Sequence, residues 1–382
     1  MSAPTDLVIL GSTGSIGVQA LEIVEANPEK FRVIGLAAGS KNIELLAEQA
    51  KKFSVPVVGT TGDRTNLISR LGNTQVIDGP SAASEIAAIA CDIVLNGITG
   101  SIGLGPTLAA LAVGNKVALA NKESLVAGGD LVMAFGRDRI IPVDSEHSAL
   151  YQCFLSGKAA EVKQIILTAS GGPFRDRSDF SDITVADALN HPTWSMGPVV
   201  TINSATLMNK GLEIIEAHYL FDLPYSKISA VIHPQSVVHS MVEFIDGSTI
   251  AQASPPNMKG PIAYAISGAN RISKATAPID WSKAHSWDFA PLDNTKFPAV
   301  DLARRCGELG GGLPAIFNAA NEVAVEAFLN GMISFAQIVD VVDATVQKLG
   351  GNSPVAIRSL SDVSAIEEDS RVVAGQLVQE RK

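Results

Sequence analysis

The chain has 382 residues, of which 46% are hydrophobic and 18% charged, and its formal net charge is −10. A chain of this length exceeds the size at which one apolar core stops growing, so we expect roughly two or three folded domains and no disordered tract. The negative charge argues against binding to nucleic acid or to an anionic membrane surface.

The cysteines and the first residues indicate the cellular compartment. Cys91, Cys153 and Cys306 stand in unrelated surroundings, which excludes a disulfide framework and a zinc motif. The first apolar run begins at Leu7, too early for a signal or transit peptide, and no apolar run approaches transmembrane length. We therefore expect a soluble, unprocessed protein of the reducing cytoplasm.

The first 143 residues alternate short apolar runs with longer helical stretches. The runs lie at 7–10, 31–38, 56–59, 92–96, 116–120 and 139–143. Short runs rich in Val, Ile and Leu, separated by segments of crossover length, are typical of parallel strands buried on both faces. They predict a doubly wound, Rossmann-like α/β domain over residues 1–143.

The middle of the chain mixes strand and helix patterns. The expected elements are a strand at 162–170, a flexible loop near 187–198, a helix at 204–221 and a hairpin formed by 236–244 and 248–254. The Asp-Gly pair between the last two runs is a strong hairpin signal. These patterns predict an α+β catalytic domain with antiparallel strands over residues 144–265.

The last third of the chain changes character twice. Residues 266–295 are polar and read as a connector, whereas helical periodicity returns from residue 314 onward. We expect a small all-α C-terminal domain over residues 296–382.

Three glycines follow the first predicted strand. Gly11, Gly14 and Gly17 stand between that strand and a predicted helix, in the spacing GxxGxxG. Glycines at this place permit a tight turn and let backbone N–H groups approach a pyrophosphate at the helix N-terminus. The pattern predicts a dinucleotide site; a simple strand-to-helix turn is the alternative.

The end of the second predicted strand indicates which dinucleotide is bound. An NAD-preferring site usually carries an Asp or Glu there to bind the ribose 2′-hydroxyl. Here Ser40, Lys41 and Asn42 follow the strand, and these side chains suit a 2′-phosphate, so NADP(H) is favoured. The alternative is a solvated helix start in which Asn42 acts as a cap.

Two acids end the run at 139–143, and a third lies further along the chain. Asp144 and Glu146 face the same way if the segment is extended, but a helix beginning near Ser145 would also favour acids in its first turn. Three carboxylates without a Cys or His cluster suit Mg²⁺ or Mn²⁺. Glu213 completes this trio, and unrelated surface acids are the alternative.

The helix that carries Glu213 has two further features. Asn209 and Lys210 lie four and three residues before Glu213, so the three side chains share one helix face. Gly211 costs about 1 kcal/mol against alanine, which suggests that something approaches the helix closely.

Several polar residues suit a phosphate monoester. SGGPFR begins at Ser170, and the hydroxyl of Ser204 joins the amide of Asn209 and the ammonium of Lys210. Trp194 lies in the loop HPTWSMG, which reads either as a lid over substrate or as ordinary packing.

Eight ordered motifs carry a resemblance to one family. They are GSTGSIG, ANKESLV, PVDSEHSA, SGGPFR, HPTWSMG, NSATLMNKGLE, HPQSVVHSMVEF and FNAANEVAV, between residue 11 and about residue 325. In these motifs the chain resembles the 1-deoxy-D-xylulose 5-phosphate reductoisomerases. The resemblance implies conversion of that substrate and NADPH to 2-C-methyl-D-erythritol 4-phosphate in non-mevalonate isoprenoid synthesis, by a homodimer with a divalent cation. Mg²⁺ and Mn²⁺ are the expected ions, with Co²⁺ a further candidate.

The resemblance also implies roles for individual residues. The metal ligands are Asp144, Glu146 and Glu213, and the catalytic set adds Lys122 and His191. The substrate-binding residues are Lys122, Ser145, Glu146, Ser170, His191, Trp194, Ser204, Asn209, Lys210 and Glu213. The cofactor-binding residues are Gly11, Thr13, Gly14, Ser15, Ile16, Gly39, Ser40, Lys41, Asn42, Asn121, Glu123 and Gly197. The family often reads AGKN where this chain reads AGSKN, so Ser40, Lys41 or both contact the 2′-phosphate.

Other functions stay open at this point. A short-chain reductase needs Tyr-x-x-x-Lys, and a semialdehyde dehydrogenase needs a nucleophilic cysteine; the sequence offers neither convincingly. The remaining alternatives are another NADP-dependent reductase of a small phosphorylated carbonyl compound and a non-catalytic NADP-sensing module. For His191, orienting a hydroxyl and relaying a proton are both open, as are retroaldol and ketol-shift routes.

Overall fold

The computed structural model describes residues 3–273, 275–351 and 356–381, which form two compact units. Unit 1 comprises Met1–Ser124, Val132–Ser148 and Asn257–Ala277, and unit 2 comprises Leu125–Leu131, Ala149–Pro256 and Pro278–Lys382. The borders of these units do not coincide with the domain boundaries expected at residues 143, 265 and 295, because each unit is assembled from separate stretches of the chain.

Unit 1 contains a parallel sheet of seven strands. They are β1 (Thr5–Leu10), β2 (Phe31–Ala38), β3 (Val57–Thr60), β4 (Gln75–Asp78), β5 (Ile93–Asn96), β6 (Lys116–Leu119) and β7 (Ile140–Pro142). Their order in the sheet is β4-β3-β2-β1-β5-β6-β7. The order reverses between β1 and β5, which confirms the doubly wound prediction. Strand β4 was not predicted, because its sequence QVID is half exposed and forms no apolar run.

Helices cover both faces of this sheet. They are α1 (Ser15–Ala26), α2 (Ile43–Lys52), α3 (Arg64–Leu71), α4 (Ala82–Ala87), α5 (Leu104–Ala112) and α11 (Lys259–Ile266). Leu7 and Ile9 of β1 share a core with α1, α2, α3 and α11. On the other face, a Cβ at Gly35 of β2 would lie 3.2 Å from the side chains of both Ile86 of α4 and Val8 of β1. The alternation of side chains along β1 thus gives each face its own helices.

Helix α11 belongs to unit 1, although more than a hundred residues separate it from β7. Its residues Ile262, Ala263 and Ile266 are buried in the same core as the sheet, and it contacts α1. The expected domain boundary at 265 cuts through this helix. An apolar helix that returns to an earlier core leaves no signal in local periodicity.

Unit 2 contains a mixed sheet of five strands. They are β8 (Val162–Ala169), β9 (Ile228–Ile232), β10 (Val238–Phe244), β11 (Thr249–Ala253) and β12 (Ala290–Pro291), in the order β11-β10-β8-β9-β12. Strands β10 and β11 form the predicted hairpin, and β10 pairs antiparallel with β8. The expectation of antiparallel strands holds only in part, because β9 was not predicted and pairs parallel with β8.

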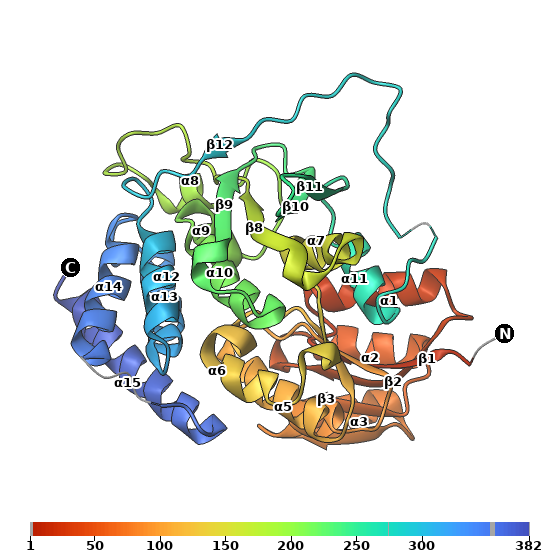
Figure 1. Ribbon diagram of the computed structural model, residues 1–382. Coiled ribbons are helices and arrows are strands. Elements are labelled where there is room, and N and C mark those ends of the chain that lie inside the picture. Colours follow the sequence, from red (N-terminus) through yellow and green to blue (C-terminus); the bar gives the residue numbers. More distant parts are fainter. Residues whose placement is uncertain (1–2, 274, 352–355, 382) are drawn as a thin grey trace. The chain divides into compact units, whose positions relative to one another are not determined.

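The C-terminal helices complete unit 2. They are α12 (Ala299–Leu309), α13 (Leu313–Leu329), α14 (Gln337–Gly350) and α15 (Leu360–Gln379). Phe317 of α13 and Ile165 of β8 belong to one apolar core. These helices, blue in Figure 1, therefore share a unit with the second sheet. The helical character expected for the C-terminal region is confirmed, and these helices belong to the same compact unit as the second sheet.

The predicted helix at 204–221 is two helices. Helix α9 (Pro198–Ala205) ends before Leu207, whose φ of 58° is left-handed, and α10 (Met208–Phe221) begins directly after it. The single-helix prediction was wrong because a left-handed leucine gives no sequence signal. The close approach expected at Gly211 comes from α12, since a Cβ there would lie 2.7 Å from the Cβ of Ala303. In the described parts of the chain, no helix combines the length and the apolar character needed to span a membrane.

Candidate active site

The turn after β1 requires its glycines. Gly11 has a φ of +74°, and a Cβ there would lie 2.7 Å from the carbonyl oxygen of Gly97, directly after β5. A Cβ at Gly17 would lie 2.4 Å from the Cα of Ser12. The turn thus lies at the point where the strand order reverses, which is where open α/β sheets bind their ligands.

Helix α1 begins at this turn with a bare N-terminus. Its N-cap residue is Gly14, so no side chain accepts a hydrogen bond from the first-turn N–H groups. Orphan N–H groups and the positive end of the helix dipole together suit a pyrophosphate. Thr13, Ser15 and Ile16 flank this position, and Gly14 and Ser15 are exposed. The local geometry therefore fits a dinucleotide.

The residues after β2 form an exposed 3₁₀ turn. It spans Ser40–Asn42 and follows the exposed Gly39. The side chain of Asn42 accepts a hydrogen bond of 3.3 Å from the backbone N–H of Leu45 and caps α2. This is the structural alternative that the sequence left open for Asn42. Ser40 and Lys41 stay at the surface, and neither repels a phosphate.

Asn121 organises the loop after β5. Its Nδ2 donates to the carbonyl oxygens of Ile98 and Gly100 and to Oε2 of Glu123, each at 2.8 Å. Asn121 is buried, so its side chain holds the loop in place. Any contact between Asn121 and a cofactor must therefore use its backbone or act through this loop.

The acids after β7 lie at the start of a helix. Helix α7 (Ser145–Cys153) begins directly after Asp144, whose carbonyl oxygen accepts a hydrogen bond from the N–H of Ser148. Glu146 is therefore in the first helical turn and not in an extended segment; the extended interpretation was wrong. The ammonium of Lys122 lies 2.6 Å from Oδ2 of Asp144, and the hydroxyl of Ser145 donates to Oε2 of Glu146.

Helix α10 carries the third acid in a buried polar cluster. Glu213 is fully buried and accepts hydrogen bonds from Nδ2 of Asn209 and Nζ of Lys210. The three side chains meet on one helix face, as their spacing predicted. A buried carboxylate is stable only when it is paired in this way.

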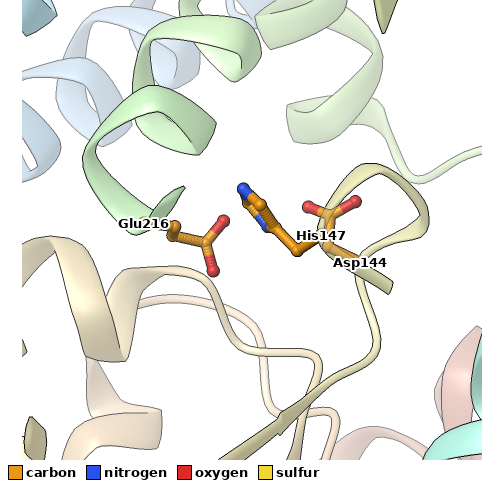
Figure 2. Close-up of side chains that lie close together, drawn as sticks. All are labelled: Asp144, His147 and Glu216. Carbon is orange, nitrogen blue, oxygen red and sulfur yellow. The ribbon is translucent and has the colours of Figure 1, made fainter. Parts of the chain in front are cut away.

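Two further buried residues were not singled out as ligands. His147 follows Glu146 on α7, and Glu216 lies one turn after Glu213 on α10. Figure 2 shows His147 with Asp144 at the start of α7, and Glu216 on α10. The three-residue spacing of the two glutamates in LEIIEAH was the available signal for Glu216.

His191 joins the two serines expected at the phosphate. Its Nε2 lies 3.0 Å from Oγ of Ser170 and 3.1 Å from Oγ of Ser204. Ser170 directly follows β8, His191 lies on the loop after α8 (Val185–Leu189), and Ser204 lies on α9. Three segments thus bring two hydroxyls and an imidazole to one point, and the phosphate role that the resemblance implies for them stays a prediction.

The other ring nitrogen of His191 fixes its protonation. Nδ1 accepts hydrogen bonds from the backbone N–H groups of Thr193 at 3.1 Å and Trp194 at 2.9 Å. A nitrogen that accepts carries no proton, so Nε2 carries it and donates to the serine hydroxyls. Burial, and then the charge of Arg175, lower the pKa of His191. The ring is therefore a neutral donor, which favours orienting over proton transfer.

The loop after Ser170 needs two glycines. Gly171 and Gly172 have φ values of +81° and +64°, and the N–H of Gly172 donates to Oγ of Ser170. A Cβ at Gly172 would lie 2.9 Å from the Cα of Ala205 at the end of α9. The loop and α9 are therefore packed backbone to backbone.

Trp194 rests against the second sheet. Its ring meets the ring of His239 edge-on, with centroids 6.2 Å apart, and is half-buried. Oγ1 of the neighbouring Thr193 donates to the carbonyl oxygen of Pro234. Gly197 is exposed and caps α9, so this loop leads directly into the helix that carries Ser204.

The cysteines offer no nucleophile. Burial is the largest cause that raises the pKa of Cys153 to about 11 and the pKa of Cys91 and Cys306 to about 12. Thiols with such pKa values are protonated at neutral pH and unreactive. These thiols therefore give no support to the cysteine-dependent semialdehyde dehydrogenase alternative.

The candidate residues divide between the units. Unit 1 holds the dinucleotide candidates except Gly197, together with Lys122, Asp144, Ser145 and Glu146. Unit 2 holds Gly197, Glu213, Trp194 and the phosphate candidates. The fold and the glycine turn define a dinucleotide-binding oxidoreductase class, to which unit 2 adds a polar, phosphate-type site.

Comparisons with known proteins narrow this class. Residues 7–129 match the family description "1-deoxy-D-xylulose 5-phosphate reductoisomerase", and residues 140–221 and 253–373 match two descriptions of its C-terminal domain. The reductoisomerase of Pseudarthrobacter chlorophenolicus is 54% identical over 377 residues, which cover 95% of this chain and 96% of the relative. That of Streptomyces coelicolor is 51% identical and covers 98% and 93% of the two chains.

Solved structures agree over the whole chain. The Zymomonas mobilis reductoisomerase in complex with NADPH has a TM-score of 0.91 and 39% identity, covering 98% of this chain and 99% of the other. A second reductoisomerase, in complex with NADPH, fosmidomycin and magnesium, has a TM-score of 0.91, 38% identity and 98% coverage of both chains. The chain belongs to the 1-deoxy-D-xylulose 5-phosphate reductoisomerase family.

Proposed function

We propose that this chain converts 1-deoxy-D-xylulose 5-phosphate and NADPH to 2-C-methyl-D-erythritol 4-phosphate, with the help of a divalent cation. The 54% identity to a named reductoisomerase over nearly the whole chain carries the proposal. The related structure with NADPH, fosmidomycin and magnesium supports both the cofactor and the metal. A sensing module would not need this set of acids and phosphate-type donors.

Asp144, Glu146 and Glu213 are the proposed metal ligands. All three offer carboxylate oxygens, the donors that Mg²⁺ and Mn²⁺ prefer. The cations Lys122 and Lys210 already contact Asp144 and Glu213, which fits positions built to hold positive charge. The proposal requires the two units to present these oxygens to a single ion.

The reaction places negative charge on substrate oxygens, both when the carbon skeleton rearranges and when the carbonyl group is reduced. A bound divalent cation supplies Lewis-acid stabilisation of that charge. In this proposal Lys122 adds a second positive charge beside Asp144, and Ser145 orients a substrate hydroxyl. The protein thus provides a preorganised electrostatic environment, which is the largest contribution in many enzymes.

The substrate phosphate is assigned to Ser170, His191, Ser204, Asn209 and Lys210. Two hydroxyls, an imidazole N–H, an amide and an ammonium match the acceptor oxygens of a phosphate dianion. The phosphate takes no part in the bonds that break and form, so its binding energy is available to position the substrate. Trp194 is then placed to close over the bound sugar and exclude water.

The cofactor is assigned to the turn after β1 and the turn after β2. Thr13, Gly14, Ser15 and Ile16 offer backbone N–H groups to the pyrophosphate, and Ser40 and Lys41 are proposed to bind the 2′-phosphate. NADPH supplies the hydride that reduces the rearranged carbonyl compound. Gly39, Asn121, Glu123 and Gly197 are proposed to complete the cofactor site.

An assay that follows NADPH absorbance with the pentulose phosphate tests this function. We expect oxidation of NADPH that stops with a chelator and returns with Mg²⁺ or Mn²⁺, and a product identified by NMR as the branched tetrol phosphate. NADPH binding without turnover would instead favour a sensing module. Turnover of other phosphorylated carbonyl compounds, but not of the pentulose phosphate, would favour a different reductase.

A homodimer and a cytoplasmic location are proposed as well. The family resemblance supports the dimer. The described residues form no disulfide, and all three cysteines are free, which supports a reducing compartment. Light scattering should give twice the monomer mass, and fractionation should place the protein in the cytoplasm. A monomeric mass or a secreted protein would contradict these proposals.

A further inference from the structure

A lysine far along the chain holds the loop that follows Ser170. The ammonium of Lys296 donates a hydrogen bond of 2.6 Å to the backbone carbonyl oxygen of Arg175, and 121 residues separate the two. Lys296 is half-buried and lies outside every motif that the sequence singled out. This hydrogen bond fixes a backbone atom of the loop. We therefore expect Lys296 to affect the position of the loop and not to take part in the reaction itself.

The loop has an unusual need for such an anchor. Gly171 and Gly172 both adopt left-handed backbone conformations, and two adjacent glycines lose more conformational freedom on ordering than any other pair. At one end β8 holds the loop through Ala169. At the other end the loop is held by the packing of Gly172 against α9 and by the residues after Gly172.

Two contacts secure that second end. Phe174 is buried in the core of unit 2, and its ring centroid lies 6.4 Å from that of Phe180. Lys296 holds the next residue, Arg175, by its carbonyl oxygen. Without the second contact, Phe174 and the packing of Gly172 against α9 would hold this end of the loop alone.

Lys296 is itself presented rigidly. The side chain of Asp293 accepts hydrogen bonds from the N–H groups of Thr295 and Lys296, each at 3.1 Å. The Lys296 ammonium lies 5.4 Å from the ring centroid of Phe297 and 5.8 Å from that of Phe180. Two aromatic faces therefore attract the charge and leave the carbonyl of Arg175 as its hydrogen-bond acceptor.

We infer that Lys296 is a positioning residue of the phosphate site: its ammonium fixes the Arg175 carbonyl and thereby the loop that presents Ser170. The inference rests on the proposed function, which assigns a phosphate to Ser170, His191 and Ser204. The phosphate takes no part in the bonds that break and form. Loss of the anchor therefore weakens substrate binding more than it slows the chemical step.

Steady-state kinetics of Lys296→Met test the inference. Methionine keeps most of the length of the side chain and removes the donor, so we expect KM for the pentulose phosphate to rise about tenfold. We expect KM for NADPH and kcat to stay within about twofold of the wild-type values. Lys296→Arg, which restores a cationic donor, should recover most of the affinity.

Lys227 provides a matched control. Its ammonium also donates to a backbone carbonyl in unit 2, that of Val162 at the start of β8, but it is remote from the loop after Ser170. Lys227→Met should leave KM for the pentulose phosphate unchanged. An equal rise in both methionine variants, an unchanged KM in Lys296→Met, or a parallel rise in KM for NADPH would each overturn the inference.

Two further measurements keep the test decisive. If Lys296→Met does not fold, Lys296→Gln replaces it. We expect Lys296→Gln to raise KM for the pentulose phosphate, by less than the tenfold expected for Lys296→Met. A wild-type KM would overturn the inference. Inorganic phosphate binding, followed by the ¹⁵N shift of His191, does not depend on turnover. A wild-type protein that binds phosphate more tightly than Lys296→Met, yet fails to oxidise NADPH with the pentulose phosphate, would sink the proposed function alone.

Discussion

The backbone N–H of Trp194 donates a hydrogen bond of 2.9 Å to Nδ1 of His191, whose Nε2 meets Ser170 on the opposite side of the ring. One imidazole therefore connects the proposed phosphate site to the turn that carries the tryptophan. The connection to Trp194 requires the neutral ring, because Nδ1 accepts there, whereas Nε2 donates to Ser170 in either protonation state. Protonation of Nδ1 would break the connection to Trp194.

The first prediction concerns pH. Burial lowers the pKa of His191, so the midpoint of its titration should lie below the ordinary imidazole pKa of about 6.5. The neutral ring therefore contributes to the free energy of unfolding at pH values above the unfolded-state pKa. This contribution is lost as the pH falls from the unfolded-state pKa through the lower folded-state pKa. An NMR titration of ¹⁵N-labelled His191, assigned with His191→Asn, should show a midpoint below 6.5. A midpoint above it would refute the neutral-donor role.

The second prediction concerns Trp194. Added fosmidomycin, with NADPH and Mg²⁺, should change the tryptophan emission, because the ring leaves or tightens its contact with His239. Trp194→Phe should abolish the change, while Trp281 and Trp287 continue to emit.

Two substitutions at His191 separate its two connections. Glutamine places an N–H donor near the Nε2 position, whereas asparagine keeps an acceptor near Nδ1. His191→Gln should retain phosphate binding but lose the Trp194 response, and His191→Asn should do the reverse. If wild-type emission is insensitive to the ligand, the lid interpretation is wrong.

The third prediction concerns Asp144. Asp144→Asn removes a proposed ligand and the partner of Lys122, so turnover should fall by about a hundredfold or more. Thermal unfolding is measured alongside, because the side chain of Asp144 is only 16% exposed and pairs with Lys122; the loss of turnover should persist at temperatures where the variant is fully folded. Asp78→Asn is the matched control, since Asp78 also forms an ion pair in unit 1, with Arg64, and should retain wild-type turnover. Near-normal turnover of Asp144→Asn would speak against the metal role.

The fourth prediction concerns cofactor choice. Lys41→Ala should lower kcat/KM for NADPH about tenfold and leave kcat/KM for NADH unchanged, because a charged hydrogen bond to the 2′-phosphate is lost. Lys51→Ala removes a lysine from the last turn of α2 and should affect neither. Equal kcat/KM values of the wild type for NADPH and NADH would contradict the preference for NADP(H) that we inferred from the residues after the second strand.

Local patterns predicted most of unit 1. Strand β2 matches its predicted range, and β1, β3, β5, β6 and β7 lie within one or two residues of theirs, because buried parallel strands are continuous apolar runs. Exposed β4 lacks such a run. The return of α11 to the first core depends on tertiary packing and leaves no periodic signal.

The site was predictable where spacing alone determines geometry. Asn209, Lys210 and Glu213 meet because helix geometry places residues three and four apart on one face. The convergence of Ser170, His191 and Ser204 followed from the family resemblance. The anchor at Lys296 was not predictable, because 121 residues separate it from Arg175 and no short motif contains both.

The most direct test of the metal proposal is anomalous diffraction from a crystal grown with Mn²⁺, NADPH and fosmidomycin. The account predicts one manganese peak with carboxylate oxygens of Asp144, Glu146 and Glu213 at bonding distance. A peak ligated by other residues, or by Asp144 and Glu146 without Glu213, would contradict it.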